Sequence, residues 1–159
     1  MKKFASAMYL LLVCSAAALD RDSLQGAWLE DRINWVDVPK DINPGAQWTQ
    51  AAILYFGRGR KFGRVDCTVS RMGNKWMTIS RGDPRGVYKG QWKGEEPISV
   101  KYRLVEATIL PIGQKLPGPT KRATVTISGS TLIFEGKKFH REKGLDKEIE
   151  EALYGIAKQ

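Results

Sequence analysis

Hydrophobic and polar residues alternate along most of the chain after residue 24, which is the period of strands with one buried face. In residues 64–72, for example, Val65, Cys67 and Val69 fall on one side of the segment. Breaks that contain glycine, a residue typical of tight turns, separate the segments that share this period. The pattern predicts eight strands, at 25–33, 52–56, 64–72, 75–80, 87–93, 98–110, 122–128 and 131–141.

Two of these segments are irregular. In residues 98–110 the hydrophobic face changes after Leu104, so we expect a bulge near 104–105 that bends the strand. In residues 131–141, Gly136 indicates a second bulge.

The last part of the chain has a different period. Leu145, Ile149, Leu153 and Ile156 recur at the spacing of one helical stripe, which predicts an amphipathic helix over about 145–157. We expect this helix to cover an outer patch of the strands. The alternative is binding to a membrane surface, but the glutamates on its polar side disfavour contact with an anionic bilayer.

Eight short strands with mostly tight connections are typical of an up-and-down barrel or a sandwich. We expect an all-β, eight-stranded antiparallel up-and-down β-barrel with a C-terminal α-helix. Strict up-and-down order places Arg141 beside Trp28, where a guanidinium stacked on the indole would close the base of the barrel. The same order places the long connection 34–50 at the open end and the connection 111–121 at the base.

The first 18 residues have the features of a secretory signal peptide. Lys2 and Lys3 precede a short apolar stretch, and Ala16 to Ala18 offer a small-residue cleavage site. The stretch is shorter than the roughly 20 apolar residues that a membrane-spanning helix needs, and no transmembrane segment is expected. We therefore expect a secreted or periplasmic protein with one domain over 19–159. Lipid attachment at Cys14 is an alternative that the bulky Val13 before it disfavours.

The chain is basic, with 26 Lys and Arg against 17 Asp and Glu. Such an excess favours contact with anionic surfaces, although it also suits a merely soluble surface. The segment 58–64, RGRKFGR, could grip phosphate groups. Phe62 is its one aromatic residue, whereas platforms for single-stranded nucleic acid need several, so nucleic acid is not an expected partner.

Three residues carry a resemblance to a known family. Gly26-Ala27-Trp28 in the first strand resembles the Gly-x-Trp motif of the lipocalins, and Arg141 before the final helix resembles that family's closing arginine. The connection 34–50 is similar to the lid over the lipocalin cup. The Thr-Asp-Tyr motif of the family is absent, and Cys67 has no partner for a disulfide once the signal peptide is removed. The chain is therefore lipocalin-like, within the broader calycin group.

The resemblance implies a barrel that holds a small hydrophobic molecule. We expect aromatic residues of the strands to face inward and those of the connection 34–50 to close over the ligand. An eight-stranded barrel has room either for side chains or for one small ligand, so the same residues could instead fill the interior. The connection 34–50 could likewise form a small core of its own. The candidate ligand-binding residues are Trp35, Trp48, Tyr88, Trp92, Tyr102 and Phe134, and the candidate barrel-closing residues are Gly26, Trp28 and Arg141.

No motif for catalysis is present in the sequence. His140 is the only histidine, and no nucleophile, metal-ligand spacing or dinucleotide fingerprint accompanies it. We expect no enzyme activity, no metal and no cofactor. The leading hypothesis is an exported binding protein for a small hydrophobic or amphipathic ligand. The alternative is a filled barrel that acts as an envelope-associated interaction module for an anionic surface or a protein partner.

Overall fold

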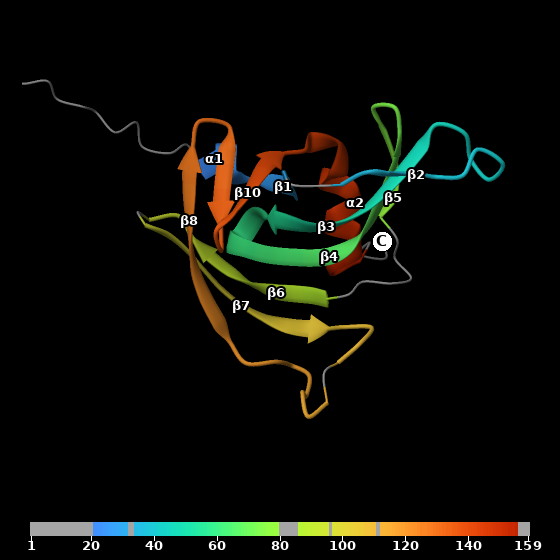
Figure 1. The fold of residues 1–159 in the computed structure, drawn as a ribbon. Helices are drawn as coiled ribbons and strands as arrows, with labels where there is room; N and C mark the ends of the chain where they lie inside the picture. The colour runs from blue at the N-terminus through green and yellow to red at the C-terminus, as the bar shows by residue number, and fades with distance from the viewer. Residues whose placement is uncertain (1–20, 32–33, 80–85, 96, 111, 156–159) are drawn as a thin grey trace, which may run out of the picture.

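The fold of the computed structural model is shown in Figure 1, and it describes residues 21–31, 34–79, 86–95, 97–110 and 112–155. Within these residues a short helical turn, α1 (Arg21–Leu24), precedes the strands, and helix α2 (Asp146–Tyr154) follows them. The strands are β1 (Gly26–Glu30), β2 (Val36–Asp37), β3 (Ala46–Phe56), β4 (Lys61–Met72), β5 (Lys75–Ile79), β6 (Gly86–Lys93), β7 (Ile98–Glu106), β8 (Lys121–Ser128), β9 (Thr131–Phe134) and β10 (Lys137–Arg141).

Eight of the strands close into an antiparallel barrel, which confirms the predicted fold class. Around the barrel they run β3-β1-β10-β9-β8-β7-β6-β4, and the pairing of β3 with β4 completes the ring. Strands β2 and β5 pair with the ends of β3 and β4 that extend past the barrel. We call this extension, made of β2, residues 46–50, residues 68–72 and β5, the flap (Figure 1).

The barrel reaches eight strands by a different set from the one predicted. Segment 75–80 was expected in the barrel, but β5 pairs with β4 alone and belongs to the flap. Segment 131–141 was expected as one strand with a bulge, but it divides into β9 and β10. Glu135 and Gly136 both have positive φ, at 50° and 76°, which is the backbone of a tight two-residue hairpin turn. The expected bulge in 98–110 is confirmed, because the β6–β7 register skips Val105.

The loss of segment 75–80 from the barrel and the division of segment 131–141 move the β7–β8 loop to the opposite end of the barrel from the one predicted. One strand is lost and one is gained, so β10 still returns to the start of β1, and Trp28 lies opposite Arg141 as expected. The loop between β7 and β8 instead leaves β7 at the open end, the end that also carries the flap. The prediction that placed connection 111–121 at the base was therefore wrong.

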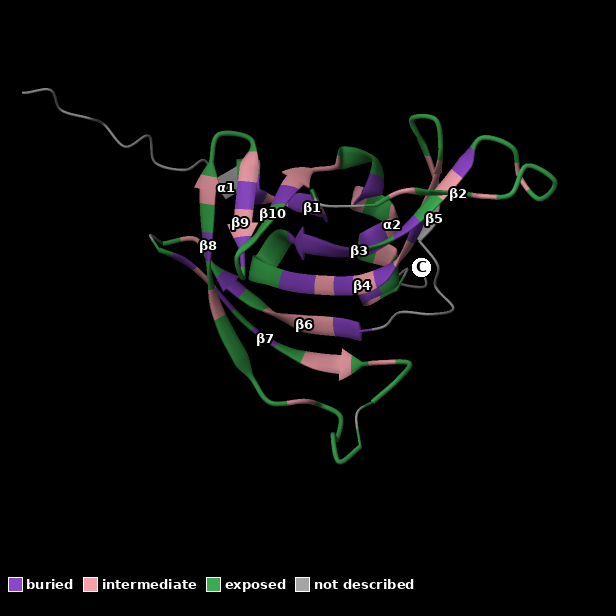
Figure 2. Cartoon of the chain, in the orientation of Figure 1, coloured by how far each residue is buried: buried purple, intermediate pink, exposed green. Residues whose placement is uncertain are grey.

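Apolar and aromatic side chains pack against one another inside the barrel. Figure 2 marks buried residues along the barrel strands. The rings contact one another in series, with centroids 5.3 Å apart for Phe56 and Phe62 and 5.7 Å apart for Phe62 and Phe134. Side chains packed in this way leave few voids larger than a water molecule. The buried members are Leu24, Trp28, Ala52, Leu54, Phe56, Phe62, Trp92, Ile98, Val100, Tyr102, Val125, Leu132, Phe134 and Phe139.

A second core forms on the outside of the barrel, where α2 covers β3 and β4. Leu145, Ile149 and Leu153 pack there against outward residues such as Ile53 and Val65. A Cβ atom on Gly63 would lie 2.3 Å from Leu153 Cδ1, so this glycine allows the close approach of the helix. The predicted helix and its packing are confirmed over the described residues, while Ile156 lies outside them.

The base of the barrel is closed by Gly26, Trp28 and Arg141, the three residues that the resemblance singled out. Arg141 donates to the backbone oxygens of Gln25 and Ala27 at 3.0 Å and forms an ion pair with Asp146 of α2 at 2.6 Å. The indole of Trp28 points into the core and donates to Leu24 O at 2.9 Å. Among the described residues no ring contact joins Arg141 to Trp28, so the expected stacking is replaced by this hydrogen-bonded closure.

Gly26 is required by the position of the Arg141 guanidinium. Its φ of +111° is unfavourable for other residues, and a Cβ atom there would lie 1.8 Å from Arg141 Nη2. We expect Gly26→Ala to lower the free energy of unfolding by about 2 kcal/mol or more, measured by urea denaturation.

The matched control is Gly129→Ala in the β8–β9 turn. Gly129 also has positive φ, at 62°, but nothing lies within 4 Å of its Cβ position. Its expected cost is about 1 kcal/mol, from the backbone conformation alone. Equal losses in the two variants would show that the Arg141 contact contributes nothing.

Candidate functional site

Four of the candidate ligand-binding residues lie inside the barrel, where they pack against each other and against the core. Tyr102 and Phe134 are 1 % exposed and their ring centroids are 5.8 Å apart. Tyr88 contacts Tyr102 at 5.9 Å, and Trp92 donates from its indole nitrogen to Gly57 O at 3.3 Å. These side chains fill the interior, which is one of the two arrangements that the sequence left open.

The other two candidates, Trp35 and Trp48, lie on the flap and away from that group. Trp35 belongs to the outer core, with Trp76 at 5.9 Å and the guanidinium of Arg71 over its ring at 3.9 Å. Trp48 pairs with Val36, so it lies on the opposite face of the flap from Trp35, and it is 38 % exposed. The two tryptophans therefore do not meet over the barrel interior.

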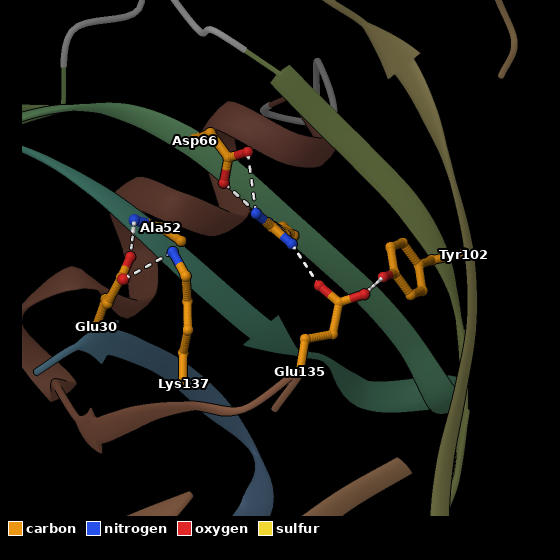
Figure 3. A network of polar contacts seen from close by, with 7 residues as sticks. Glu30, Ala52, Asp66, Tyr102, Glu135 and Lys137 are labelled. Atoms are coloured by element: carbon orange, nitrogen blue, oxygen red, sulfur yellow. Dashed lines mark hydrogen bonds and ion pairs between the residues drawn. The ribbon is translucent and has the colours of Figure 1, made fainter. Parts of the chain in front are cut away.

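A network of charged side chains covers the aromatic core at the open end (Figure 3). Arg64 on β4 forms an ion pair with Asp66 at 2.8 Å and another with Glu135 at 2.9 Å. The hydroxyl of Tyr102 donates to the same Glu135 carboxylate. This network ties the β9–β10 turn to β4 and β7 across the mouth.

A second pair extends the polar layer on the β1 side. Glu30 forms an ion pair with Lys137 at 2.8 Å and accepts from the backbone nitrogen of Ala52 at 3.2 Å (Figure 3). A cavity of about 190 Å³ lies here, lined in part by Glu30, Arg64 and Lys137. An apolar molecule entering by this route would have to separate ion pairs that are partly shielded from water.

The pKa values of the network follow from this environment. Burial alone would lower the pKa of Arg64, but the hydrogen bond and charge of Asp66 and the charge of Glu135 raise it above its ordinary value. Burial and the hydrogen bond to Glu135 raise the pKa of Tyr102. The arginine therefore stays charged and the phenol stays neutral, which are the states that the contacts require.

A basic surface covers the outside of β6, β7 and β8 and the start of β4, next to α2. In register, Lys61 lies opposite Gln91, Gln91 opposite Lys101, and Lys101 opposite Arg122. These outward positions alternate with buried ones such as Val100, as expected for strands with one face in the core. One row across four strands therefore carries three cations.

A second row lies beside the first. Lys89 is opposite Arg103 in the β6–β7 pairing, and Lys93 lies at the end of β6 nearer the base. We call Lys61, Lys89, Lys93, Lys101, Arg103 and Arg122 together the basic face. A shallow cavity of about 260 Å³ opens in it, lined by Lys89, Gly90, Gln91, Lys101, Tyr102, Arg103 and Thr120.

The basic face lies apart from the ion pairs that the described residues form. None of the ion pairs formed within the described part of the chain includes any of its six cations. Lys61 and Lys89 instead lie over the ring of Tyr154, at 5.0 and 5.5 Å from its centroid. Cations gathered without acidic partners produce a positive potential that attracts anions.

The sequence indicated another basic group, the segment 58–64, which shares only Lys61 with the basic face. Its members separate in the structure, because Arg64 points into the mouth network while Arg58 and Arg60 are exposed at the base. The basic face was missed because its residues come from four strands. The available signal was Lys and Arg at alternate outward positions, as in Lys89 and Lys93 or Lys101 and Arg103.

Comparisons of the chain with protein-family models, with curated proteins and with solved structures found no match. In the part of the chain that the structure describes, no helix has the length and apolar character needed to cross a membrane. Within the same residues, no group of three or more His, Cys, Asp and Glu is placed to hold a metal ion. The fold and surface together define a closed β-barrel with a filled interior and a cationic outer face.

The filled interior predicts the effect of removing one ring. We expect Phe134→Ala to lower the free energy of unfolding by about 4 kcal/mol and to create a cavity that binds benzene. Phe134→Leu keeps most of the volume and should cost about 1 kcal/mol. Urea denaturation and calorimetric benzene titration check both. Saturable binding of a fatty acid by the unaltered protein, with a change in Trp92 emission, would show that the interior has room.

The tyrosines predict the behaviour of the protein at high pH. Burial, followed by the charge of Glu150, raises the pKa of Tyr55 and of Tyr154 to about 12, and the pKa of Tyr102 is also raised. The fold thus favours the neutral phenols. This stabilisation is complete below the ordinary pKa of 10.0 and is lost as pH rises towards 12.

We expect an ultraviolet titration of the folded protein to show far less tyrosinate at pH 10.5 than the urea-unfolded protein shows. Unfolding free energies measured over the same range should fall as pH rises. Identical titrations in the two states would contradict the burial of these phenols.

Proposed function

We propose that this protein is an exported, lipocalin-like β-barrel that binds an anionic surface through its basic face. The observation that carries the proposal is the group of six cations on four adjacent strands, without an acidic partner among the described residues. Electrostatic attraction of this kind acts over about 8 Å at physiological salt and orients a partner before contact.

The close packing of rings inside the barrel supports a binding site on the outer surface over a binding site in the interior. The ring centroids of Tyr102, Phe134 and Phe62 lie within 6 Å of each other, and the Tyr102 hydroxyl donates to Glu135 of the charged network (Figure 3). A small hydrophobic ligand inside the barrel, the leading hypothesis from the sequence, would have to displace these side chains. We therefore favour the filled barrel as an interaction module, with a role in binding and not in catalysis.

Export and the relationship to lipocalins are part of the same proposal. The signal-like residues 1–18 support a secreted or periplasmic location, where lipid headgroups and anionic polymers are exposed. The closure by Gly26, Trp28 and Arg141 supports the likeness to lipocalins.

The test reverses charge on the basic face. We expect Lys101→Glu/Arg103→Glu/Arg122→Glu to weaken binding to immobilised heparin, a sulfated polysaccharide, by about tenfold or more at low salt. The dependence of binding on salt should become shallower, because fewer ions are displaced. Elution and surface-plasmon titrations at several salt concentrations measure both effects.

The matched control is Lys40→Glu/Lys75→Glu/Lys138→Glu. It changes the net charge by the same amount at exposed positions outside the basic face. Binding should remain close to that of the unaltered protein. Equal losses in the two triple variants would mean that net charge alone, and no particular face, determines binding.

A further inference from the structure

The loop between β7 and β8, residues 107–120, exposes large apolar side chains at the open end of the barrel. Ile109 is 81 % exposed and Ile112 is fully exposed, and Leu110 and Leu116 are each more than a third exposed. The loop contains no acidic residue, and Lys115 is its one charged residue. Figure 2 shows this exposed loop extending away from the barrel. Four exposed apolar side chains on one loop lower the solubility of a protein, and such a group indicates a surface that contacts a partner.

The loop is attached firmly and adjoins the basic face. The backbone nitrogen of Gly118 donates to Leu104 O at 2.9 Å, which closes the base of the loop. Thr120, its last residue, lines the cavity of the basic face beside Lys101 and Arg103. The loop that carries the apolar residues therefore ends at the edge of the basic face.

We propose that the anionic surface bound by this protein is a lipid bilayer, and that the β7–β8 loop inserts into it. This inference rests on the function proposed above and names its partner. Ile109 and Ile112 enter the interface between headgroups and acyl chains, while the cations of the basic face contact anionic headgroups. Two signals of this kind are what stable but reversible attachment to a membrane requires.

The apolar residues distinguish a bilayer from other anionic partners. A polysaccharide or a nucleic acid offers charge to the basic face but no apolar phase to Ile109 and Ile112. A bilayer offers both within a few ångströms of depth, and each cation near an anionic leaflet strengthens binding about fivefold. Charge and apolar surface thus complement the same partner.

The experiment measures binding of the purified protein to vesicles of phosphatidylcholine with and without phosphatidylglycerol. We expect Ile109→Ser/Ile112→Ser to lower the partition coefficient on phosphatidylglycerol vesicles by about tenfold or more. Heparin binding should be unchanged, because the basic face is intact. The control Val36→Ser/Ile42→Ser removes two other exposed apolar side chains, from β2 and the β2–β3 loop, and it should bind vesicles normally.

Insertion has its own spectroscopic signature. In Ile112→Trp the added indole should be quenched by brominated phospholipids, and its emission should shift to shorter wavelength on vesicles. The unaltered protein gives the background from its own tryptophans.

The outcomes separate the two proposals. Unchanged vesicle binding by the loop variant, together with loss in the charge-reversed variant, would overturn insertion and leave the basic face standing. Binding to heparin but not to vesicles would do the same. An equal loss in the Val36/Ile42 control would overturn the assignment to this loop. If the charge-reversed variant bound both probes like the unaltered protein, the function proposed above would itself be wrong.

Discussion

The arrangement of this protein depends on the guanidinium of Arg141, which joins three elements at the base of the barrel. It binds backbone oxygens at the start of β1, it belongs to β10, and it forms an ion pair with Asp146 of α2. Gly26 makes this possible because it leaves the space that a side chain would occupy. The same contact therefore closes the ring and fixes the helix over β3 and β4, which leaves the outer faces of β7 and β8 uncovered.

The interior of the barrel stabilises the fold, and the outer surface carries the cations. Aromatic packing from Phe56 to Phe134 and the Arg64 network above it make the inside a stabilising core. In the proposed function a partner would meet the molecule from outside, where the curved sheet holds cations from separate strands at fixed spacing. Held on a rigid sheet, these side chains lose less conformational entropy on binding than cations on a flexible tail would.

The sequence predicted the features that depend on the local period of hydrophobic residues. It missed those that depend on which strand or side chain a segment contacts. Alternation in 64–72, the bulge near Val105 and the stripe of Leu145, Ile149 and Leu153 are local, and each was confirmed. Segment 75–80 has the same alternation as a barrel strand, but period alone does not say which strand it pairs with. Gly136 could indicate a bulge or a turn, and the backbone conformation of Glu135 decides between them. Arg64 shows the same limit at the site, because its pairing with Glu135 joins residues that are distant in sequence.

The pairing of β1 with β10 joins the two ends of the domain, whereas most other barrel pairings join neighbours in the chain. Its closure carries the largest loop entropy of the sheet, and it cannot form until the last strand is available. A chain that emerges amino terminus first therefore holds β1 with one side unpaired until β10 has been synthesised. Such an open edge is a template for association with other chains. Truncation anywhere before Lys137 would make that edge permanent, so shortened forms of this protein should aggregate and not fold into smaller barrels.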